Sequence, residues 1–241
     1  MLADASLGER LMGYLPMLAQ GAATSLGLSL SAICCGFVLG AALLGVSLNR
    51  GALGLRTHGV ALYVSFFRGT PMLVQLLMLF YLPASLGLEL PPFVSALVAL
   101  SLNSAAFQCE ILRAGLAAIP RDQLEAAQVF GLTPRQTFQH IQLPQIAVAV
   151  WPTLVSEAID VLKGSAIVSV IAVTDLTRVS RQIVSGNFRP LEVYLAMAAC
   201  YLLLALLIVA VGWCVKRKLI QRRPRPVRGP IAATPFENAS T

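Results

Sequence analysis

Two acids and a lysine lie close together within one long apolar stretch of this chain. Glu157, Asp160 and Gly164 are spaced i, i+3 and i+7, which places them on one face of a helix. Lys163 follows Asp160 by three residues, a spacing at which the two side chains can form an ion pair. Two acids on one face within hydrocarbon repel each other unless water or a cationic ligand reaches them. We therefore interpret Glu157 and Asp160 as lining a path for a polar solute.

A second group of polar side chains lies in the preceding apolar stretches. Asn103 and Glu110 are seven residues apart and share a helical face, with Arg113 one turn further along. Arg68 enters at a similar depth from the neighbouring stretch, so an Arg68–Glu110 pair is expected. Two interpretations stay open. Asn103 is assigned to the path with the two acids, whereas Arg68, Glu110, Arg113 and Lys163 either line it too or form a structural charge network between helices.

These residues are carried by segments whose composition is that of a membrane protein. The chain of 241 residues is 57% hydrophobic and only 12% charged, which leaves too little polar surface to cover a soluble core. Runs of roughly 20 apolar residues, long enough to cross a bilayer, recur along it. The sequence predicts an all-α, polytopic fold of about five spans, at residues 26–48, 60–81, 93–112, 146–173 and 194–215. Small residues along the first span favour close helix packing.

The distribution of basic residues predicts the orientation. With the N-terminus outside, the segments on the cytoplasmic side hold twelve of the 18 Lys and Arg residues, and four lie outside. The net charge of +7 then reports topology and contact with anionic lipid, and no aromatic platform supports binding to nucleic acid. Arg178 and Arg181 make the outer side locally basic, and we expect an amphipathic surface helix there. Residues 1–215 form the membrane domain, and the basic tail 216–241 is predicted to be disordered.

A polar hairpin interrupts the apolar spans at residues 120–144. Gly131 suits the C-terminal cap of a short helix over 123–130. Thr133, Pro134 and Gln136 open a second helix with an N-cap, a proline at the first position and a capping box. Small side chains in the middle of the first helix leave its backbone accessible. The segment therefore has the pattern of a helix that a membrane protein offers to the groove of a partner.

The hairpin resembles the EAA loop of ABC importer permeases. The matching residues are Glu125, Ala126, Ala127, Gly131, Ile141, Leu143 and Pro144. Three further motifs are similar to the polar amino acid branch of that family, which carries histidine, glutamine, arginine and opines. They are Phe67-Arg68-Gly69-Thr70-Pro71 with Val74-Gln75, Asn103-Ser104-Ala105-Ala106 with Glu110 and Arg113, and Phe188-Arg189-Pro190 with Glu192. The resemblance spans most of the chain.

This resemblance implies the assembly and the division of labour within it. It implies two cytoplasmic ATPase subunits, a second permease (identical or paralogous), an extracytoplasmic substrate-binding protein and a small amino acid substrate. The chain would sit in a bacterial inner membrane and couple to the ATPases through Glu125, Ala126, Ala127, Gly131 and Pro144. ATP and magnesium would be held by the partner ATPase, with no cofactor bound by this chain. Where the family has Lys-Asp-Thr-Ser, this chain has Lys163-Gly164-Ser165-Ala166 and lacks the acid.

Missing motifs bear on the alternatives. The chain has no phosphate-binding loop, nucleophile elbow or zinc-binding histidine pair, which argues against an ATPase or a membrane enzyme. Its five cysteines have no metal-ligand spacing, so we expect no metal site. An ion-coupled secondary transporter that uses Glu157 and Asp160 is the main alternative. Five spans without an internal repeat argue against it.

Overall fold

The computed structural model describes residues 7–48 and 54–221, and within them the chain forms helices joined by short turns, with no strand. The all-α prediction is thus confirmed. The long helices are α1 (Leu7–Leu48), α4 (Pro92–Ala117), α7 (Leu143–Gly164) and α9 (Pro190–Gln221). The shorter elements are α2 (Gly54–Gly69), α3 (Met72–Ser85), α5 (Arg121–Val129), α6 (Pro134–Thr137), the π-helix η1 (Phe138–Gln142), the 3-10 helix η2 (Ser165–Ile171) and α8 (Leu176–Asn187).

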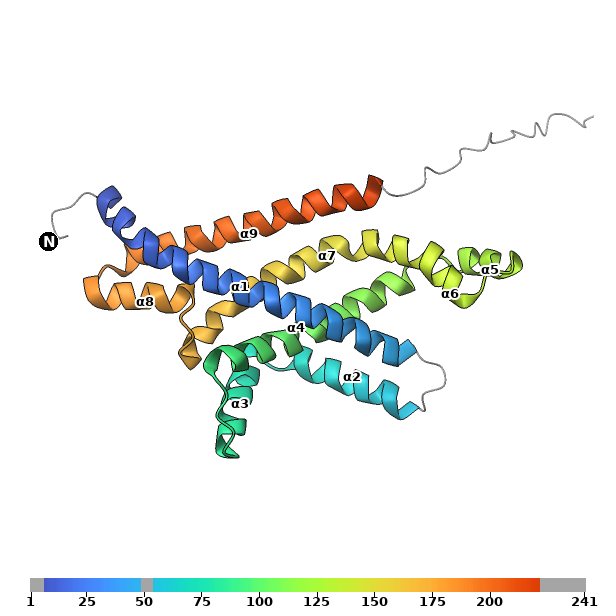
Figure 1. Ribbon diagram of the computed structural model, residues 1–241, viewed down its shortest axis with the longest axis horizontal. Coiled ribbons are helices and arrows are strands. Elements are labelled where there is room, and N and C mark those ends of the chain that lie inside the picture. Colours follow the sequence, from blue (N-terminus) through green and yellow to red (C-terminus); the bar gives the residue numbers. More distant parts are fainter. Residues whose placement is uncertain (1–6, 49–53, 222–241) are drawn as a thin grey trace, which may run out of the picture.

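The long helices lie lengthwise, and the short amphipathic helices gather at opposite ends (Figure 1). One end holds α5 and α6, together with the C-terminal end of α9. The other end holds α8 and the N-terminal end of α1. The structure therefore separates the hairpin from the amphipathic helix around Arg178 and Arg181 by the length of the long helices.

Close packing of α1 against α4 forms the centre of the molecule. A β-carbon at Gly36 would lie 3.1 Å from Ser104 Cβ, and one at Gly40 would lie 2.8 Å from the carbonyl oxygen of Ala105. Because real β-carbons avoid such distances, these two glycines let the helix backbones approach directly. Small residues of the first span thus serve packing within this chain.

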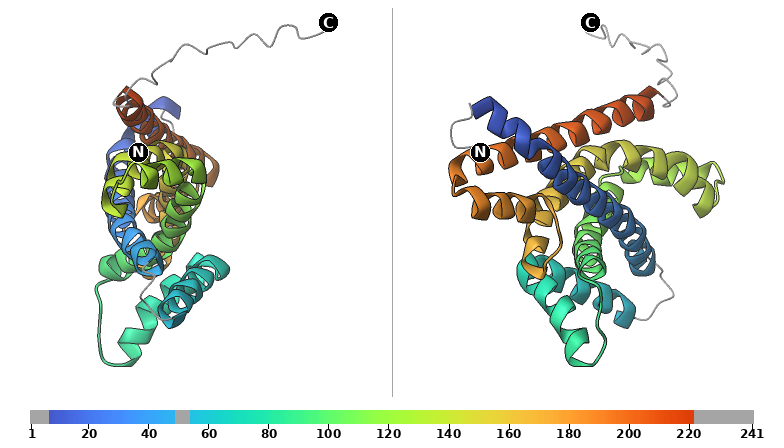
Figure 2. Two further views of the ribbon diagram at one scale, coloured as in Figure 1. Left: turned by 90° about the vertical axis from the view of Figure 1, so that its right-hand side faces the viewer. Right: turned by 60° about the vertical axis from the view of Figure 1, so that its left-hand side comes forward.

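The second predicted span is not a continuous helix, which corrects the assignment of 60–81. It is broken at Thr70-Pro71, and the two halves, α2 and α3, are bent by 109°. Figure 2 shows α3 projecting away from the other helices. Pro71 lacks the amide hydrogen that would continue α2 and disfavours helical backbone at Thr70, so the break is local in origin.

The other span boundaries also differ from the predictions. The α-helix predicted to reach residue 173 ends at Gly164 and continues as the 3-10 turn η2. By length and composition, α1, α4 and α9 can each cross a membrane, and the bent pair α2–α3 would make a fourth span. Glu157, Asp160 and Lys163 lower the hydropathy of α7. Helix α9 extends to Gln221 and so includes the start of the predicted tail, whereas 222–241 lie outside the described residues.

Candidate transport pathway and coupling hairpin

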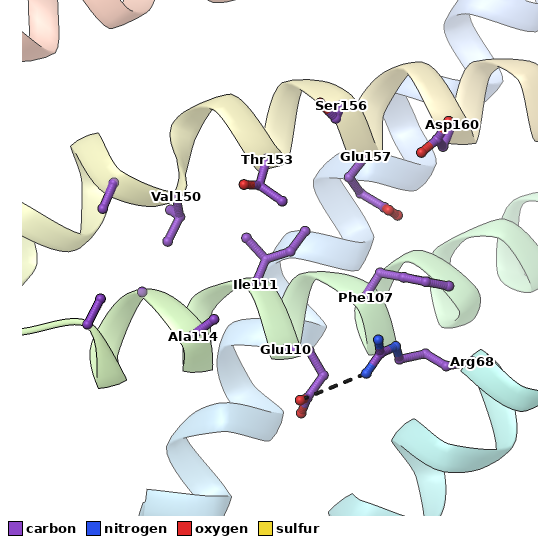
Figure 3. A pocket seen from close by; sticks show the side chains of 13 residues that line it. Arg68, Phe107, Glu110, Ile111, Ala114, Val150, Thr153, Ser156, Glu157 and Asp160 are labelled. Carbon is purple, nitrogen blue, oxygen red and sulfur yellow. Dashed lines mark ion pairs between the residues drawn. The ribbon is translucent and has the colours of Figure 1, made fainter.

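A cavity of about 670 Å³ lies between α4 and α7 and is partly open. Figure 3 shows Glu157 and Thr153 of α7 pointing toward α4, with Phe107 and Ile111 of α4 below them. Arg68 reaches the same region from α2. The acids Glu157, Asp160 and Glu110 all line this cavity. The predicted charged residues of three separate helices are therefore brought to one place.

Glu157 is the most enclosed acid of the cavity. It is 8% exposed, and the Ser104 hydroxyl donates a hydrogen bond of 2.9 Å to its Oε1. Gln108 in turn donates to Ser104 Oγ (2.9 Å) and to the carbonyl oxygen of Ile33 on α1 (3.1 Å). Sequence reasoning missed Ser104 as the partner of Glu157 and Gln108 as the partner of Ser104. Their i, i+4 spacing within an apolar span was the available signal.

The other charges of this region are paired. Arg68 Nη1 lies 3.9 Å from Glu110 Oε2, as expected, and Arg113 Nε lies 3.1 Å from Glu110 Oε1. Lys163 Nζ lies 2.8 Å from Asp160 Oδ1, which is the predicted pair on α7. Within the described ranges, none of the ion pairs includes Glu157. The cavity therefore holds one enclosed acid that forms no ion pair among the described residues.

Asn103 lies outside the lining of this cavity and at the bend between α2 and α3 instead. It donates to the Phe67 carbonyl oxygen (3.1 Å) and to Gln75 Oε1 (2.9 Å). Gln75 is buried and donates to the carbonyl oxygens of Phe67 and Thr70 (both 2.9 Å). These bonds satisfy carbonyl groups that the broken helix leaves free. Asn103 and Glu110 do share the face of α4 turned to α2, as predicted.

The hairpin is built by the caps that its sequence predicts. Gly131 has a φ of +72°, a left-handed conformation that favours glycine, directly after the C-cap of α5. The Thr133 amide donates to Gln136 Oε1 (2.9 Å), and the Gln136 amide donates to Thr133 Oγ1 (3.3 Å). This reciprocal pair is the predicted capping box. Helix α5 itself begins at Arg121, two residues earlier than expected.

The hairpin exposes apolar surface. Ala127 of the EAA motif is buried, whereas Glu125 and Ala126 are exposed. Val129 and Phe130 are 86% and 83% exposed, at the end of α5. The hairpin thus presents two large apolar side chains to solvent.

A short π-helix connects the hairpin to the cavity helix. Helix α6 continues through η1 into α7, where Pro144 occupies the first turn. Gln145 of α7 donates to Gln123 of α5 (2.7 Å) and to the carbonyl oxygen of Ile141 (2.9 Å). The hairpin is thus joined to α7 through the backbone and through a side-chain bond. Helix α5 is therefore linked by the chain and by a side-chain bond to the helix that carries Glu157.

The exposed hairpin is thus continuous with a helix that lines a polar cavity. The sequence matches the family described as binding-protein-dependent transport system inner membrane component over residues 41–221, and the chain belongs to this family. The resemblance inferred from the motifs is thereby confirmed.

Individual relatives agree with this membership. The chain is 40% identical to the arginine transport system permease protein ArtQ of Bacillus subtilis, over 65% of this chain and 72% of that one. It is 32% identical to the glutamine transport system permease protein GlnP of Escherichia coli, over 80% and 89% of the two chains. The crystal structure of an amino acid ABC transporter with histidines matches with a TM-score of 0.81 at 32% identity, covering 87% and 97%. The MetNI methionine ABC transporter (TM-score 0.70, 20% identity, covering 85% and 97%) shares the fold.

Proposed function

We propose that this chain is the permease subunit of an ATP-driven importer for polar amino acids, and that its substrates carry a positive charge. The single observation that carries the substrate class is Glu157. Its carboxylate is enclosed in the cavity between α4 and α7 with a hydroxyl partner but no cation. Burying a carboxylate without a cation is unfavourable, and a guanidinium or ammonium group of a substrate removes that cost.

Relatives support the polar amino acid class. The names of similar permeases specify arginine and glutamine, and the similar crystal structure was solved with histidines. A zwitterionic amino acid brings an ammonium and a carboxylate into the cavity. Glu157 suits the ammonium or a cationic side chain, with Asp160 and its partner Lys163 nearby. We therefore favour basic or opine-like substrates over acidic ones.

In this proposal the chain forms the path, and its partners supply energy and substrate. Two ATPase subunits dock on the hairpin at Glu125, Ala126, Ala127 and Gly131 and bind the ATP and magnesium. Closure of the ATPase pair moves α5 and, through Pro144 and η1, tilts α7. A second permease completes the path, and a binding protein delivers the amino acid. The chain lies in the bacterial inner membrane with its N-terminus outside and its C-terminus in the cytoplasm.

The test is uptake by the complete complex in vesicles, with wild type and Glu157→Gln compared. The variant keeps the shape and the bond from Ser104 but removes the charge. Removal of one partner from a buried charged contact costs about 2–5 kcal/mol, so uptake of a cationic amino acid should fall at least about 30-fold. Uptake by the wild type should require ATP and persist with an uncoupler.

Glu89→Gln is the matched control, because Glu89 is an exposed acid on the loop between α3 and α4. It should leave uptake unchanged. Unchanged uptake in Glu157→Gln, combined with a lower yield of assembled complex, would make Glu157 a structural residue. Loss of wild-type uptake on addition of an uncoupler would favour the ion-coupled alternative instead.

A further inference from the structure

A small polar pocket lies at the end of the molecule opposite the hairpin. It measures about 230 Å³ and is lined by Ser169 of η2 and by Arg178, Arg181, Gln182 and Ser185 of α8. Figure 1 shows α8 at the end away from α5 and α6. Two guanidinium groups one helical turn apart contribute to the lining, and no acid does. The pocket therefore has the composition of a site for an anion.

The charges of these two arginines are not offset by the protein. At the same end, Arg10 and Arg189 both pair with Glu192, at 3.1 and 3.4 Å. No ion pair within residues 7–48 and 54–221 includes Arg178 or Arg181. Arg178 donates to the carbonyl oxygen of Ser169 (3.4 Å), and Arg181 donates to the Ser169 hydroxyl. Both side chains are thus directed to η2 by neutral groups.

The nearest acid in the sequence, Asp175, does not pair with these two arginines. Asp175 is buried, and its two carboxylate oxygens accept from the backbone amides of Arg178 (2.9 Å) and Thr177 (3.1 Å). It therefore caps α8 and stabilises its N-terminal end. Among the described residues Asp175 forms no ion pair with Arg178 or Arg181, so the two guanidinium groups stay available.

Helix α8 presents this pocket to water. Its apolar residues Leu176, Val179 and Ile183 are buried against α1 and α9, in a cluster with Leu18 and Val193. A helix that inserts into a lipid surface keeps an exposed apolar face for the acyl chains. On α8 that face is already packed within the protein, and the exposed side chains of Leu176–Asn187 are polar, with a single exposed aromatic ring, Phe188, at the C-cap. The partner that α8 suits is accordingly a polar macromolecule in the aqueous phase.

We propose that the pocket of Ser169, Arg178 and Arg181 receives carboxylate side chains of the substrate-binding protein. This inference rests on the proposed function, which supplies that partner and places α8 on the outer side. An acidic side chain brings negative charge alone. A free amino acid would bring its ammonium group into a pocket with two uncompensated cations and no acid, so the pocket does not suit the substrate itself.

The experiment measures ATP hydrolysis by the complete complex in vesicles as a function of the concentration of liganded binding protein. Arg181→Gln removes the more exposed charge, and Arg181→Lys keeps it. The half-saturating concentration should rise about 5- to 10-fold in Arg181→Gln at low ionic strength, and less in Arg181→Lys. Its dependence on salt should also flatten. Because the docked complex is the same once formed, the effect falls on this concentration and not on the maximal rate.

The matched control is Arg56→Gln, which removes an exposed arginine at the start of α2. It should change neither the half-saturating concentration nor its salt dependence. The same lack of change in Arg181→Gln, with the complex assembled, would overturn the inference. So would an effect that appears without binding protein and only in vesicles of anionic lipid, because the ligand would then be a lipid phosphate.

A further experiment distinguishes an error in the proposed membrane orientation from an error in the proposed role of the pocket. In a variant without the five native cysteines, Ser185→Cys should react with a membrane-impermeant thiol reagent added outside. Reaction from the cytoplasmic side only would contradict the proposed orientation. If the reagent reacts from outside, uptake is normal and Arg181→Gln has no effect, the proposed function stands. The docking role of the pocket is then contradicted.

Discussion

The two short amphipathic helices at opposite ends of the molecule use their side chains in contrary ways. Helix α5 buries Ala127 and leaves Val129 and Phe130 almost fully exposed. Helix α8 buries Leu176, Val179 and Ile183 and exposes mainly polar residues, although Phe188 at its C-cap is 85% exposed. The apolar side chains at the end of α5 thus face solvent, whereas most of those of α8 pack against α1 and α9.

The difference indicates two kinds of docking. Apolar contact depends little on salt and favours an attachment that persists. Contact between charges in water is weakened by salt and favours rapid association and release. An ATPase that must move the hairpin in every cycle suits the first kind. A binding protein that must leave after each delivery suits the second.

The largest effect is expected from Gly131→Asp, which tests the docking at α5. The free chain has open space at this position, so the fold tolerates the added β-carbon apart from the strain of the left-handed backbone. Against a docked ATPase, the β-carbon and the charge obstruct the turn. Uptake and stimulated ATP hydrolysis should both be abolished, while the protein still inserts into the membrane.

A matched control is available in the same chain. Gly87 also has a left-handed φ, +81°, and also follows a helix C-cap in open space. Gly87→Asp should therefore impose similar strain with little loss of stimulated hydrolysis. If Gly131→Asp behaved like Gly87→Asp, the hairpin would not contact the ATPase.

A smaller effect is expected from Phe130→Ser, which removes apolar surface without strain. Burial of a phenylalanine side chain is worth about 1.5–3 kcal/mol, so the affinity for the ATPase should fall about 10- to 100-fold. The loss should be similar at low and high salt, in contrast to Arg181→Gln. Binding of the purified ATPase to the permease in detergent measures it.

Leu86→Ser serves as the control, because Leu86 is the exposed C-cap of α3, just before Gly87. It should leave ATPase binding unchanged. A strong salt dependence of the Phe130→Ser defect would contradict the distinction between apolar docking at α5 and charged docking at α8.

The smallest effect is expected from Asp175→Ala, which tests whether α8 is held by the chain itself. Loss of an N-cap costs about 0.5–2 kcal/mol, and here two backbone amides lose their acceptor. The melting temperature of the purified protein should fall by about 2–4 °C for each kcal/mol.

The counterpart in α5 is Asp122→Ala. Asp122 is an exposed acid in the first turn, but α5 has no side-chain cap bond. This variant should melt at the wild-type temperature. Equal losses in the two variants would show that α8 depends no more on its cap than α5 does.

Local signals made the hairpin predictable. The cap at Gly131 and the box of Thr133 and Gln136 depend on residues within one turn of each other, and both formed as expected. The ion pairs of Asp160 with Lys163 and of Arg68 with Glu110 could also be predicted from the sequence. In each case, helical spacing or equal depth brings opposite charges together.

The break in the second span was not predicted, because the mean hydropathy of a window of about 20 residues does not respond to a local break in the helix. Apolar residues continue on both sides of Pro71, and the bend is then fixed by side chains that are distant in sequence. Gln75 and Asn103 bond to the carbonyl groups of the broken turn from two different helices. The contact of Ser104 with Glu157 likewise depends on how α4 and α7 pack, which a single sequence does not state.

The π-helix η1 changes the rotation of the hairpin relative to α7. A π turn holds one residue more than an α turn, so the hairpin and the cavity face of α7 are out of phase by about 100° relative to an unbroken helix. The orientation of the hairpin about the axis of α7 is thus set independently of the face of α7 that lines the cavity. Deletion of one residue within 138–142 would restore a regular helix and rotate the hairpin about the axis of α7, although α5 and its EAA motif would remain in the sequence.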